Sequence, residues 1–270
     1  MRFIILSALS PRFNTIGTLR IEKLAKYLST NADVKIIAGM PLLPENSLYL
    51  KKKMDIGSAE LIEIPARRLK HDSRQSDREG SSNQVGRGIA TSVLTKMKFA
   101  LAPLAEYLLP LSPGGIIWHD KKAFEREVES SLLSMNEEQV IMISSFGPWF
   151  TTKLAMKLKK RYKKRVFWVA DFRDPSFGNV HSVITHSSFN RRATKKILDN
   201  CDLITCVNHQ MIDDYSLIAN EAKYLYLPNG YDPSDIEAKN IELKAEEKNN
   251  IFNIVYTGSF YPSSGRDISG

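Results

Sequence analysis

The sequence has few cysteines, no long apolar run and no N-glycosylation sequon. Its two cysteines are too few for a disulfide scaffold or for a four-cysteine zinc module. No apolar run approaches the roughly 18 residues of a membrane-spanning helix, and the short apolar N-terminus lacks the cleavage site of a signal peptide. These absences predict a soluble cytoplasmic protein whose thiols are reduced.

Fingerprints of dinucleotide and triphosphate binding are missing as well. The loop after the first apolar run holds a single glycine, Gly17, so neither a G-x-G-x-x-G turn nor a P-loop is present there. This argues against a nicotinamide or flavin dehydrogenase and against an ATPase. With 43% hydrophobic and 25% charged residues, the composition is that of a globular protein and excludes a disordered chain, a collagen or a coiled coil.

Apolar runs alternate with segments of helical periodicity over most of the chain. This alternation predicts an α/β fold, a Rossmann-like parallel sheet with helices on both faces. We expect strands at residues 2–7, 34–38, 61–64, 140–143, 166–170, 203–207 and 224–227, helices at 18–30, 118–135, 151–165 and 209–218, and a long polar loop at 67–87. Because ligands bind beyond the carboxyl ends of the strands in such sheets, the pattern points to the loops at 8–17, 144–149 and 171–175.

A dense polar group stands just beyond the strand predicted at 166–170. Asp171 and Asp174 supply carboxylates that bind sugar hydroxyls or act as a base, and Arg173 offers a two-pronged donor for a phosphate or carboxylate. The alternative is an Asp–Arg cluster that satisfies itself and caps a helix. For Gly17, binding of an anion at the start of the following helix competes with a plain turn.

The net charge of +8 resides in one segment. Residues 151–165 carry eight basic side chains and no acid, while Leu154, Leu158 and Tyr162 recur every four residues and predict an amphipathic helix. This helix either packs on the sheet with a solvated outer face or binds an anionic membrane surface. The candidates for membrane binding are Lys153, Lys157, Lys160, Arg161 and Lys164. Nucleic acid is not expected as a partner, because no aromatic residues are interleaved with the basic ones.

Two further apolar features are expected to belong to the core. Residues 99–111 form a strongly apolar stretch, for which a core helix is favoured over a segment that dips into a membrane interface. Cys201 and Cys206 are expected as core thiols, because a zinc site would need another ligand and a different spacing. No zinc or other metal is therefore expected at these cysteines.

Six segments, in order along the chain, resemble motifs of the family-four glycosyltransferases. They are residues 11–28 with Gly17, Arg20 and Leu24; residues 144–148; residues 169–175, which resemble the DFRDPW motif of one branch; residues 201–207; residues 227–232, which resemble pNGfD; and residues 252–261, which resemble ytGsly. Their order and spacing extend over nearly the whole chain. Ser176 departs from the pattern, since it stands where the DFRDPW motif has tryptophan.

The resemblance implies a GT-B architecture, in which two Rossmann-like domains face each other across a cleft. In that family the N-terminal domain binds the acceptor, the C-terminal domain binds the nucleotide-sugar donor, and the sugar keeps its anomeric configuration without a metal or cofactor. By resemblance, the catalytic candidates are Asp171 and Asp174, the acceptor-binding candidates are Gly17, Arg20, Phe146 and Arg173, and the donor-binding candidates are Gly258 and Ser259.

The same resemblance divides the chain into an acceptor-binding domain at 1–230, a linker at 231–250, and the first strand and loop of a truncated donor-binding domain at 251–270. We expect residues 234–270 to be poorly ordered or to borrow a sheet edge, because a lone strand cannot bury its faces. The predicted function is transfer of a sugar from a nucleotide sugar to a lipid-linked or polysaccharide acceptor, in the cytoplasm or at the inner face of a membrane. The alternative is a non-catalytic acceptor- or partner-binding module, or one half of a split transferase.

Overall fold

The structure is a computed structural model of the chain, and it describes residues 1–41, 43, 47, 50–51, 53–68, 104, 107–110, 117–134, 139–177 and 188–233. Its strands are β1 (Arg2–Ser7), β2 (Asp33–Pro41), β3 (Glu60–Arg68), β4 (Ile117–His119), β5 (Val140–Ser145), β6 (Val166–Phe172), β7 (Leu203–Cys206) and β8 (Tyr224–Tyr226). Its helices are α1 (Ile16–Leu28), α3 (Lys121–Ser134), α4 (Trp149–Tyr162), the short 3-10 helix η3 (Lys163–Arg165), α5 (Ser188–Leu198) and α6 (His209–Ser216).

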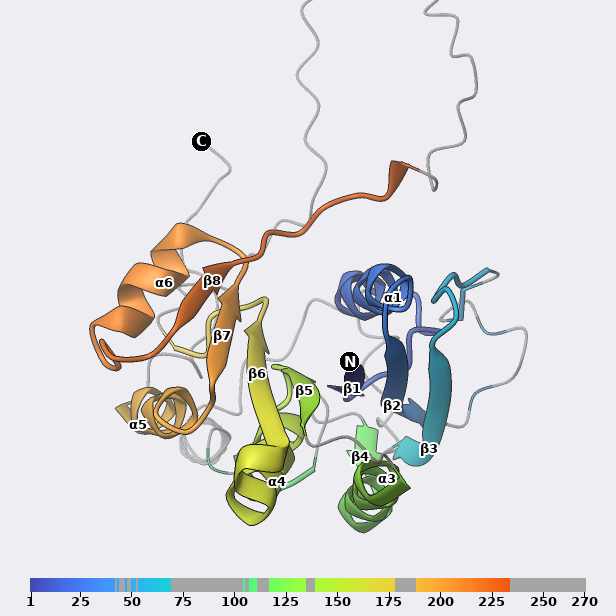
Figure 1. Ribbon diagram of the computed structural model, residues 1–270, viewed down its shortest axis with the longest axis horizontal. Coiled ribbons are helices and arrows are strands. Elements are labelled where there is room, and N and C mark those ends of the chain that lie inside the picture. The colour runs from blue at the N-terminus through green and yellow to red at the C-terminus, as the bar shows by residue number, and fades with distance from the viewer. Residues whose placement is uncertain are drawn as a thin grey trace, which may run out of the picture.

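Within the described residues, the strands form one sheet in the order β4-β3-β2-β1-β5-β6-β7-β8. Every neighbouring pair is parallel except β3 and β4, which are antiparallel at one edge. The strand order reverses at β1, because β2 and β3 lie on one side of it and β5 to β8 on the other (Figure 1). The predicted Rossmann-like α/β fold is confirmed. A crevice for ligands forms beyond the carboxyl ends of the strands at such a reversal.

Apolar side chains cover both faces of the sheet. On one face, Ile21 and Ala25 of α1 pack against alternate residues of β1 and β2. On the other face, α3, α4, α5 and α6 contribute to a larger core that includes Phe124, Leu154, Ile197 and Tyr215. Figure 1 shows α1 on one side of β1 and β2, and α3 and α4 on the other. Helices therefore lie on both faces, as the sequence predicts.

Helix α1 begins earlier than predicted. Its N-cap is Thr15 and not Thr18, since the Thr15 side chain accepts a hydrogen bond from the Thr18 amide (3.4 Å). The Thr18 side chain turns inward, where its hydroxyl donates to the carbonyl of Phe13 (2.5 Å). Gly17 therefore lies within the first turn of the helix and not in the loop before it.

Strand β6 extends two residues beyond the predicted end at residue 170. Asp171 pairs with Ser145 of β5 on one side and with Thr205 of β7 on the other, and Phe172 is fully buried. Neighbouring strands on both sides supply the backbone hydrogen bonds that keep the chain extended. Asp171 is therefore a strand residue, and the loop after β6 begins at Arg173.

The helix predicted at 118–135 is wrong at its start. Ile117 and His119 are buried and Trp118 is exposed, which is the alternation of a strand, and β4 pairs with the end of β3. Asp120 ends this strand, because its carboxylate accepts from the amides at 122 and 123 (3.0 Å each) and starts α3.

Several expectations fall on residues outside those described. They include the loop from residue 69 to 87, the linker from 234 to 250, and the donor strand at 251–270, together with their predicted order or disorder. Of residues 99–111, 104 and 107–110 are described. Tyr107 packs edge-on against Trp149 and Phe189, as expected of the core, whereas Leu108 is exposed. None of the helices in the described part of the chain is long and apolar enough to cross a bilayer.

Candidate functional site

The candidate site lies at the carboxyl edge of the sheet, where β1, β5, β6 and β7 end. Backbone hydrogen bonds fasten the segments that leave these strands. The amide of Phe146, after β5, donates to the carbonyl of Asp171 (2.8 Å), and the amide of Leu227 donates to the carbonyl of Cys206 at the end of β7 (2.9 Å). Segments that are far apart in the sequence are thereby held side by side, which brings their polar side chains together.

Asp171 forms a buried ion pair with Arg20 of α1. Arg20 Nε donates to Asp171 Oδ2 (3.0 Å) and Arg20 Nη2 donates to Asp171 Oδ1 (2.7 Å), which is the two-point geometry of an arginine–carboxylate pair. The hydroxyl of Thr205 also donates to Oδ1 (2.6 Å). The two charged side chains are only 7% and 1% exposed, so the pair is shielded from water.

The remaining N–H groups of Arg20 reach the turn after β8. Nη2 donates to the carbonyl of Leu227 (3.0 Å), and Nη1 donates to the carbonyl of Pro228 and to Oδ1 of Asn229 (3.2 Å each). With the two bonds to Asp171, all five N–H groups of the guanidinium are engaged. Acceptor binding by Arg20 stays a prediction, and in this arrangement all donors of the guanidinium are engaged within the protein.

The Asp171 carboxylate faces inward and not toward the crevice. Its side chain is 1% exposed and its oxygens already accept three hydrogen bonds, from Arg20 and Thr205. This is the self-satisfied Asp–Arg alternative, although it links α1 to the sheet and caps no helix. The geometry gives Asp171 the task of positioning Arg20, and its catalytic role stays a prediction without a contact to support it.

The Arg173 side chain lies directly against Gly17 in the first turn of α1. A Cβ added to Gly17 would lie 1.2 Å from Arg173 Nη1 and 2.3 Å from its Cζ, so the guanidinium occupies the space that any other residue would need. Arg173 Nε also donates to the carbonyl of Phe146 (3.4 Å). Gly17 is thus more than a plain turn residue, because its missing side chain lets Arg173 lie against the first turn of α1.

Gly147 borders the same guanidinium from the loop after β5. Its φ of +94° is in the region that favours glycine, and a Cβ there would lie 3.4 Å from Arg173 Nη2. The guanidinium is therefore held between two glycine positions. Its side chain keeps 22% of its surface exposed, and Asp174 is its nearest described carboxylate, at 3.9 Å. A cation in this state can receive an anionic or hydroxyl-rich ligand.

Phe146 and Asp174 have opposite surroundings. The Phe146 ring is buried, stacks on Phe172 (centroids 4.8 Å apart) and meets Trp149 edge-on (4.9 Å). Acceptor binding by Phe146 stays a prediction, while its side chain belongs to the core and its carbonyl accepts from Arg173. The side chain of Asp174 is 75% exposed and lies at the crevice, where it can reach a ligand.

Buried hydroxyl groups form hydrogen bonds that fix the loop after β6. The Ser176 hydroxyl lies 2.7 Å from Thr194 Oγ1 and 2.9 Å from the Tyr215 hydroxyl, and the Ser176 amide donates to that same tyrosine oxygen (3.0 Å). Burial raises the pKa of Tyr215, so the group stays a neutral phenol. The serine that replaces the motif tryptophan thus connects the loop to α5 and α6, and it keeps Arg173 and Asp174 in place.

The sequence analysis missed Thr205, Tyr215 and Asp232 as partners of the site. Thr205 carried a weak signal, because a hydroxyl within an apolar strand needs a buried partner. Asp232 is the last residue of the motif at 227–232, although the motif gave no hint of its partners, and Tyr215 carried no signal. The donor-binding candidates Gly258 and Ser259 lie outside the described residues.

Cys201 and Cys206 are free thiols, and burial raises the pKa of each to about 12. This agrees with their interpretation as core thiols, because a neutral thiol reacts slowly. In the part of the chain that the structure describes, no group of three or more potential ligands is arranged for a metal ion.

The basic run on α4 is largely paired within the fold. Lys153 donates to the carbonyl of Tyr107 and lies 4.0 Å from the centre of its ring, and burial lowers the pKa of this lysine. Lys157 and Arg161 pair with Glu125 and Glu129 of α3. Membrane binding by these three residues stays a prediction. Lys153 faces inward, and the charges of Lys157 and Arg161 are locally balanced.

Lys160 and Lys164, the other two membrane-binding candidates, are exposed. Lys163 between them is exposed as well and adopts a positive φ of 49° where α4 meets η3. Neither Lys160 nor Lys164 forms an ion pair with another described residue. The free positive charge of the run is thus concentrated at the C-terminal end of α4.

No known protein family and no curated protein matches the sequence. Among solved structures, the fold is similar to a sucrose-phosphate synthase of Thermosynechococcus elongatus (10% identity, TM-score 0.42, 87% of this chain and 93% of that chain). It is also similar to apo UGT2 of Phytolacca americana (9% identity, TM-score 0.42, 87% and 53%) and to a UGT of Medicago truncatula complexed with UDP-glucose (8% identity, TM-score 0.41, 86% and 52%). The chain spans about half the length of these two plant proteins. At such low identities and TM-scores, the likenesses carry no information about the activity or substrates of this chain.

Proposed function

We propose that the chain is the acceptor-binding part of a GT-B glycosyltransferase. The enzyme transfers a sugar from a nucleotide sugar to a lipid-linked or polysaccharide acceptor, with retention of the anomeric configuration. The order of the six motifs along the sequence supports this proposal. In it, the donor site belongs to the part of the protein that begins after the turn at 227–232, with Gly258 and Ser259 as its first candidates.

The contact of Arg173 with Gly17 is the single observation that carries the proposal. Gly17 and Arg173 come from different motifs, 156 residues apart, and meet beyond the carboxyl ends of β1 and β6. The first turn of α1 adds the partial positive charge of a helix N-terminus to that of the guanidinium. We infer that a phosphate or a carboxylate of the substrate binds Arg173 here, in the fork geometry that arginine offers.

Asp174 is the residue we propose for contact with the reacting sugar or acceptor hydroxyls. Its carboxylate is exposed beside Arg173, on a loop that the Ser176 hydroxyl fixes from behind. Asp carboxylates accept hydrogen bonds from sugar hydroxyls and can take up a proton from an attacking hydroxyl. Asp171 has no comparable access, so we assign it the positioning of Arg20 and of α1.

The proposal is tested by incubating the chain, alone and co-expressed with a complete donor-binding domain, with radiolabelled UDP-, GDP-, ADP- and dTDP-sugars and with lipid extracts or polysaccharide. We expect label from at least one donor in one of the two fractions, with the anomeric configuration of the donor retained in the product. If the chain transfers no sugar even with that domain and binds no nucleotide sugar, but does bind an acceptor, it is a non-catalytic acceptor-binding module. Binding of a nucleotide sugar with sub-millimolar affinity excludes that alternative.

We also propose that the protein binds the surface of an anionic membrane through the end of α4. Lys160, Lys163 and Lys164 are exposed at this end. A lysine near an anionic surface contributes about 1 kcal/mol to binding. A lipid-linked acceptor would make such a location useful, because the enzyme and the acceptor would share one surface.

Sedimentation with vesicles tests this membrane proposal. Lys160→Gln with Lys164→Gln should weaken binding to vesicles that contain phosphatidylglycerol by about 2 kcal/mol, or about thirtyfold. The matched control is Lys157→Gln with Arg161→Gln, which removes two charges that α3 already balances and should have a smaller effect. Equal losses for both pairs, or equal binding to vesicles of neutral lipid alone, would exclude this surface as the membrane site.

A further inference from the structure

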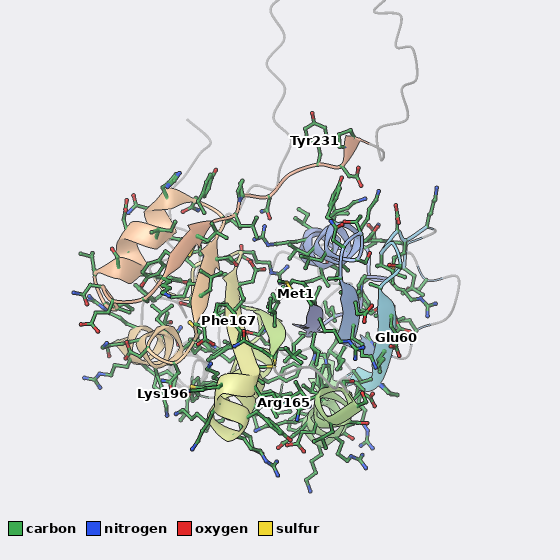
Figure 2. The ribbon with its side chains drawn as sticks, in the orientation of Figure 1. Met1, Glu60, Arg165, Phe167, Lys196 and Tyr231 are labelled. Atoms are coloured by element: carbon green, nitrogen blue, oxygen red, sulfur yellow. The ribbon has the colours of Figure 1, made fainter. Side chains whose placement is uncertain are left out.

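The six residues after β8, which we call the connector (residues 227–232), are held by α1. Figure 1 shows the chain leaving β8 and crossing toward α1. Tyr231 is 76% exposed and projects away from the ribbon in Figure 2. Asp232 differs from the rest of the connector, because its side chain is only 3% exposed. The connector is thus a surface segment with one buried, charged anchor.

Apolar packing does not hold the connector in place. A pocket of about 390 Å³ separates it from the outward side of α1. Ile16 and Leu19 of α1 border this pocket and remain exposed. Since apolar contact is incomplete here, polar contacts must supply most of the attachment.

Three basic residues of α1, spaced three apart, supply these polar contacts. Arg20 donates to the carbonyls of Leu227 and Pro228 and to the Asn229 side chain at the start of the connector. Lys23 and Lys26 lie one and two turns further along the helix. Because residues three apart are neighbours on a helix surface, the row runs alongside the connector.

The anchor at the other end of the connector is Asp232. Its Oδ2 accepts from Lys23 Nζ (3.1 Å) and from Lys26 Nζ (2.7 Å). Tyr27 is also hydrogen-bonded to Asp232, and this bond raises the pKa of the tyrosine. Lys26 bridges onward to Asp55 (2.8 Å), which lies outside the connector. Asp232 thus has at least three side-chain partners, all on α1.

Arg20 joins this row of contacts to the candidate site. Its other two N–H bonds go to Asp171 of β6, two residues before Arg173, where the following loop begins. One guanidinium therefore contacts both the strand that leads into the crevice and the chain that leaves the sheet. A displacement of the connector would have to break or distort bonds at this same guanidinium.

We propose that Arg20, Lys23, Lys26 and Asp232 form a clamp that fixes the connector on α1. The clamp sets the direction in which the chain leaves the sheet and holds the connector beside the carboxyl edge. These contacts alone are enough to infer that the connector is held on α1. That the clamp orients the donor half over the acceptor site rests on the proposed function.

Limited proteolysis of the full chain with chymotrypsin tests the clamp, because Tyr231 is an exposed cleavage site within the connector. Lys23→Gln with Lys26→Gln leaves the sequence around this site unchanged and removes two partners of Asp232. We expect cleavage after Tyr231, followed by mass spectrometry, to be at least tenfold faster than in the wild type. The melting temperature of the sheet should stay nearly unchanged, because the released connector carries the Asp232 carboxylate into solvent and glutamine and lysine have similar helix propensities.

Asp55→Asn is the matched control, because it removes the other partner of Lys26 and leaves Asp232 in place. Cleavage in this variant should stay within twofold of the wild type, and Lys23→Arg with Lys26→Arg should restore protection. Added salt should speed cleavage of the wild type and leave the double glutamine variant unaffected, after correction for protease activity. Equal cleavage rates in the wild type and the double glutamine variant would overturn the clamp. Because no substrate is used, a failed transfer assay would refute the proposed function and leave the clamp standing.

Discussion

Arg20 and Asp171 meet in a buried, two-point ion pair, with N–O distances of 3.0 and 2.7 Å and side chains that are 7% and 1% exposed. The partners stand 151 residues apart, on the first helix and on β6. Removing one member of a buried ion pair leaves the other charge buried without a partner or solvent. This destabilises the fold much more than replacing both members with apolar residues does. The pair therefore ties the stability of the domain to the geometry of its carboxyl edge.

Arg20→Met should lower the free energy of unfolding by about 3–5 kcal/mol, because it leaves the Asp171 carboxylate buried without its cation. Denaturation by urea measures this change. Arg161→Met is the matched control. It removes an arginine from an ion pair on the surface of α4 and should cost about 0–1 kcal/mol. Similar losses in the two variants would show that the Arg20 pair is not buried in solution.

Gly17→Ala should reduce substrate binding without reducing stability. The added Cβ would collide with Nη1 and Cζ of Arg173, so the guanidinium must leave its place. Within the first turn of α1, alanine itself suits the helix better than glycine by about 1 kcal/mol. We expect at least a tenfold loss in kcat/KM and an unchanged or raised melting temperature.

Gly230→Ala is the control for this change, because a Cβ there meets nothing within 4 Å. It should leave both activity and melting temperature as they are. A Gly17→Ala variant with full activity would mean that the position of Arg173 against α1 does not matter for the substrate.

His119 should make the protein less stable in acid. Its ring is fully buried, stacks on Phe150 (4.7 Å), and has no hydrogen-bond partner among the described residues for either nitrogen. Burial lowers its pKa from 6.5 to about 4. Between these values the unfolded chain binds a proton that the folded chain does not, so stability falls as the pH is lowered. At about 1.4 kcal/mol per pH unit, the full loss is about 3 kcal/mol below pH 4.

Urea denaturation at a series of pH values from 7 to 4 measures this loss. His119→Phe, which keeps an aromatic ring beside Phe150, should remove the part of the pH dependence that is due to His119. His209→Gln, which changes an exposed histidine, should leave the wild-type dependence intact. If His119→Phe unfolds with the same pH dependence as the wild type, the histidine is not a buried neutral group.

The order of strands and helices was predictable because apolar runs and polar turns are local signals. β1, β5, β7 and β8 lie close to their predicted positions. The boundaries were not predictable where tertiary contacts decide them. Asp171 looks like a loop residue in the sequence, yet pairing with β5 and β7 keeps it in the strand. Likewise, β4 forms at Ile117–His119 because the end of β3 offers an edge.

The motifs singled out candidate residues for the site, but they did not predict the contacts that these residues make. The motifs place Arg20, Asp171 and Arg173 near one another. Only the fold shows that all N–H donors of Arg20 are engaged within the protein and that the Arg173 side chain remains partly exposed. The basic run on α4 is similar, since its neutralising acids Glu125 and Glu129 come from another helix. Pairing between distant segments leaves no mark on a single sequence.

The role of Arg173 as the substrate-binding cation is best tested by comparing Arg173→Gln with Arg191→Gln. Arg191 is an exposed arginine on α5, so the control removes the same charge away from the crevice. A hydrogen bond to a charged group contributes about 1.5–3 kcal/mol, so Arg173→Gln should lower kcat/KM for sugar transfer about ten- to a hundredfold. Arg191→Gln should stay within twofold of the wild type. Equal kcat/KM values for wild type and Arg173→Gln would contradict a substrate site at this carboxyl edge.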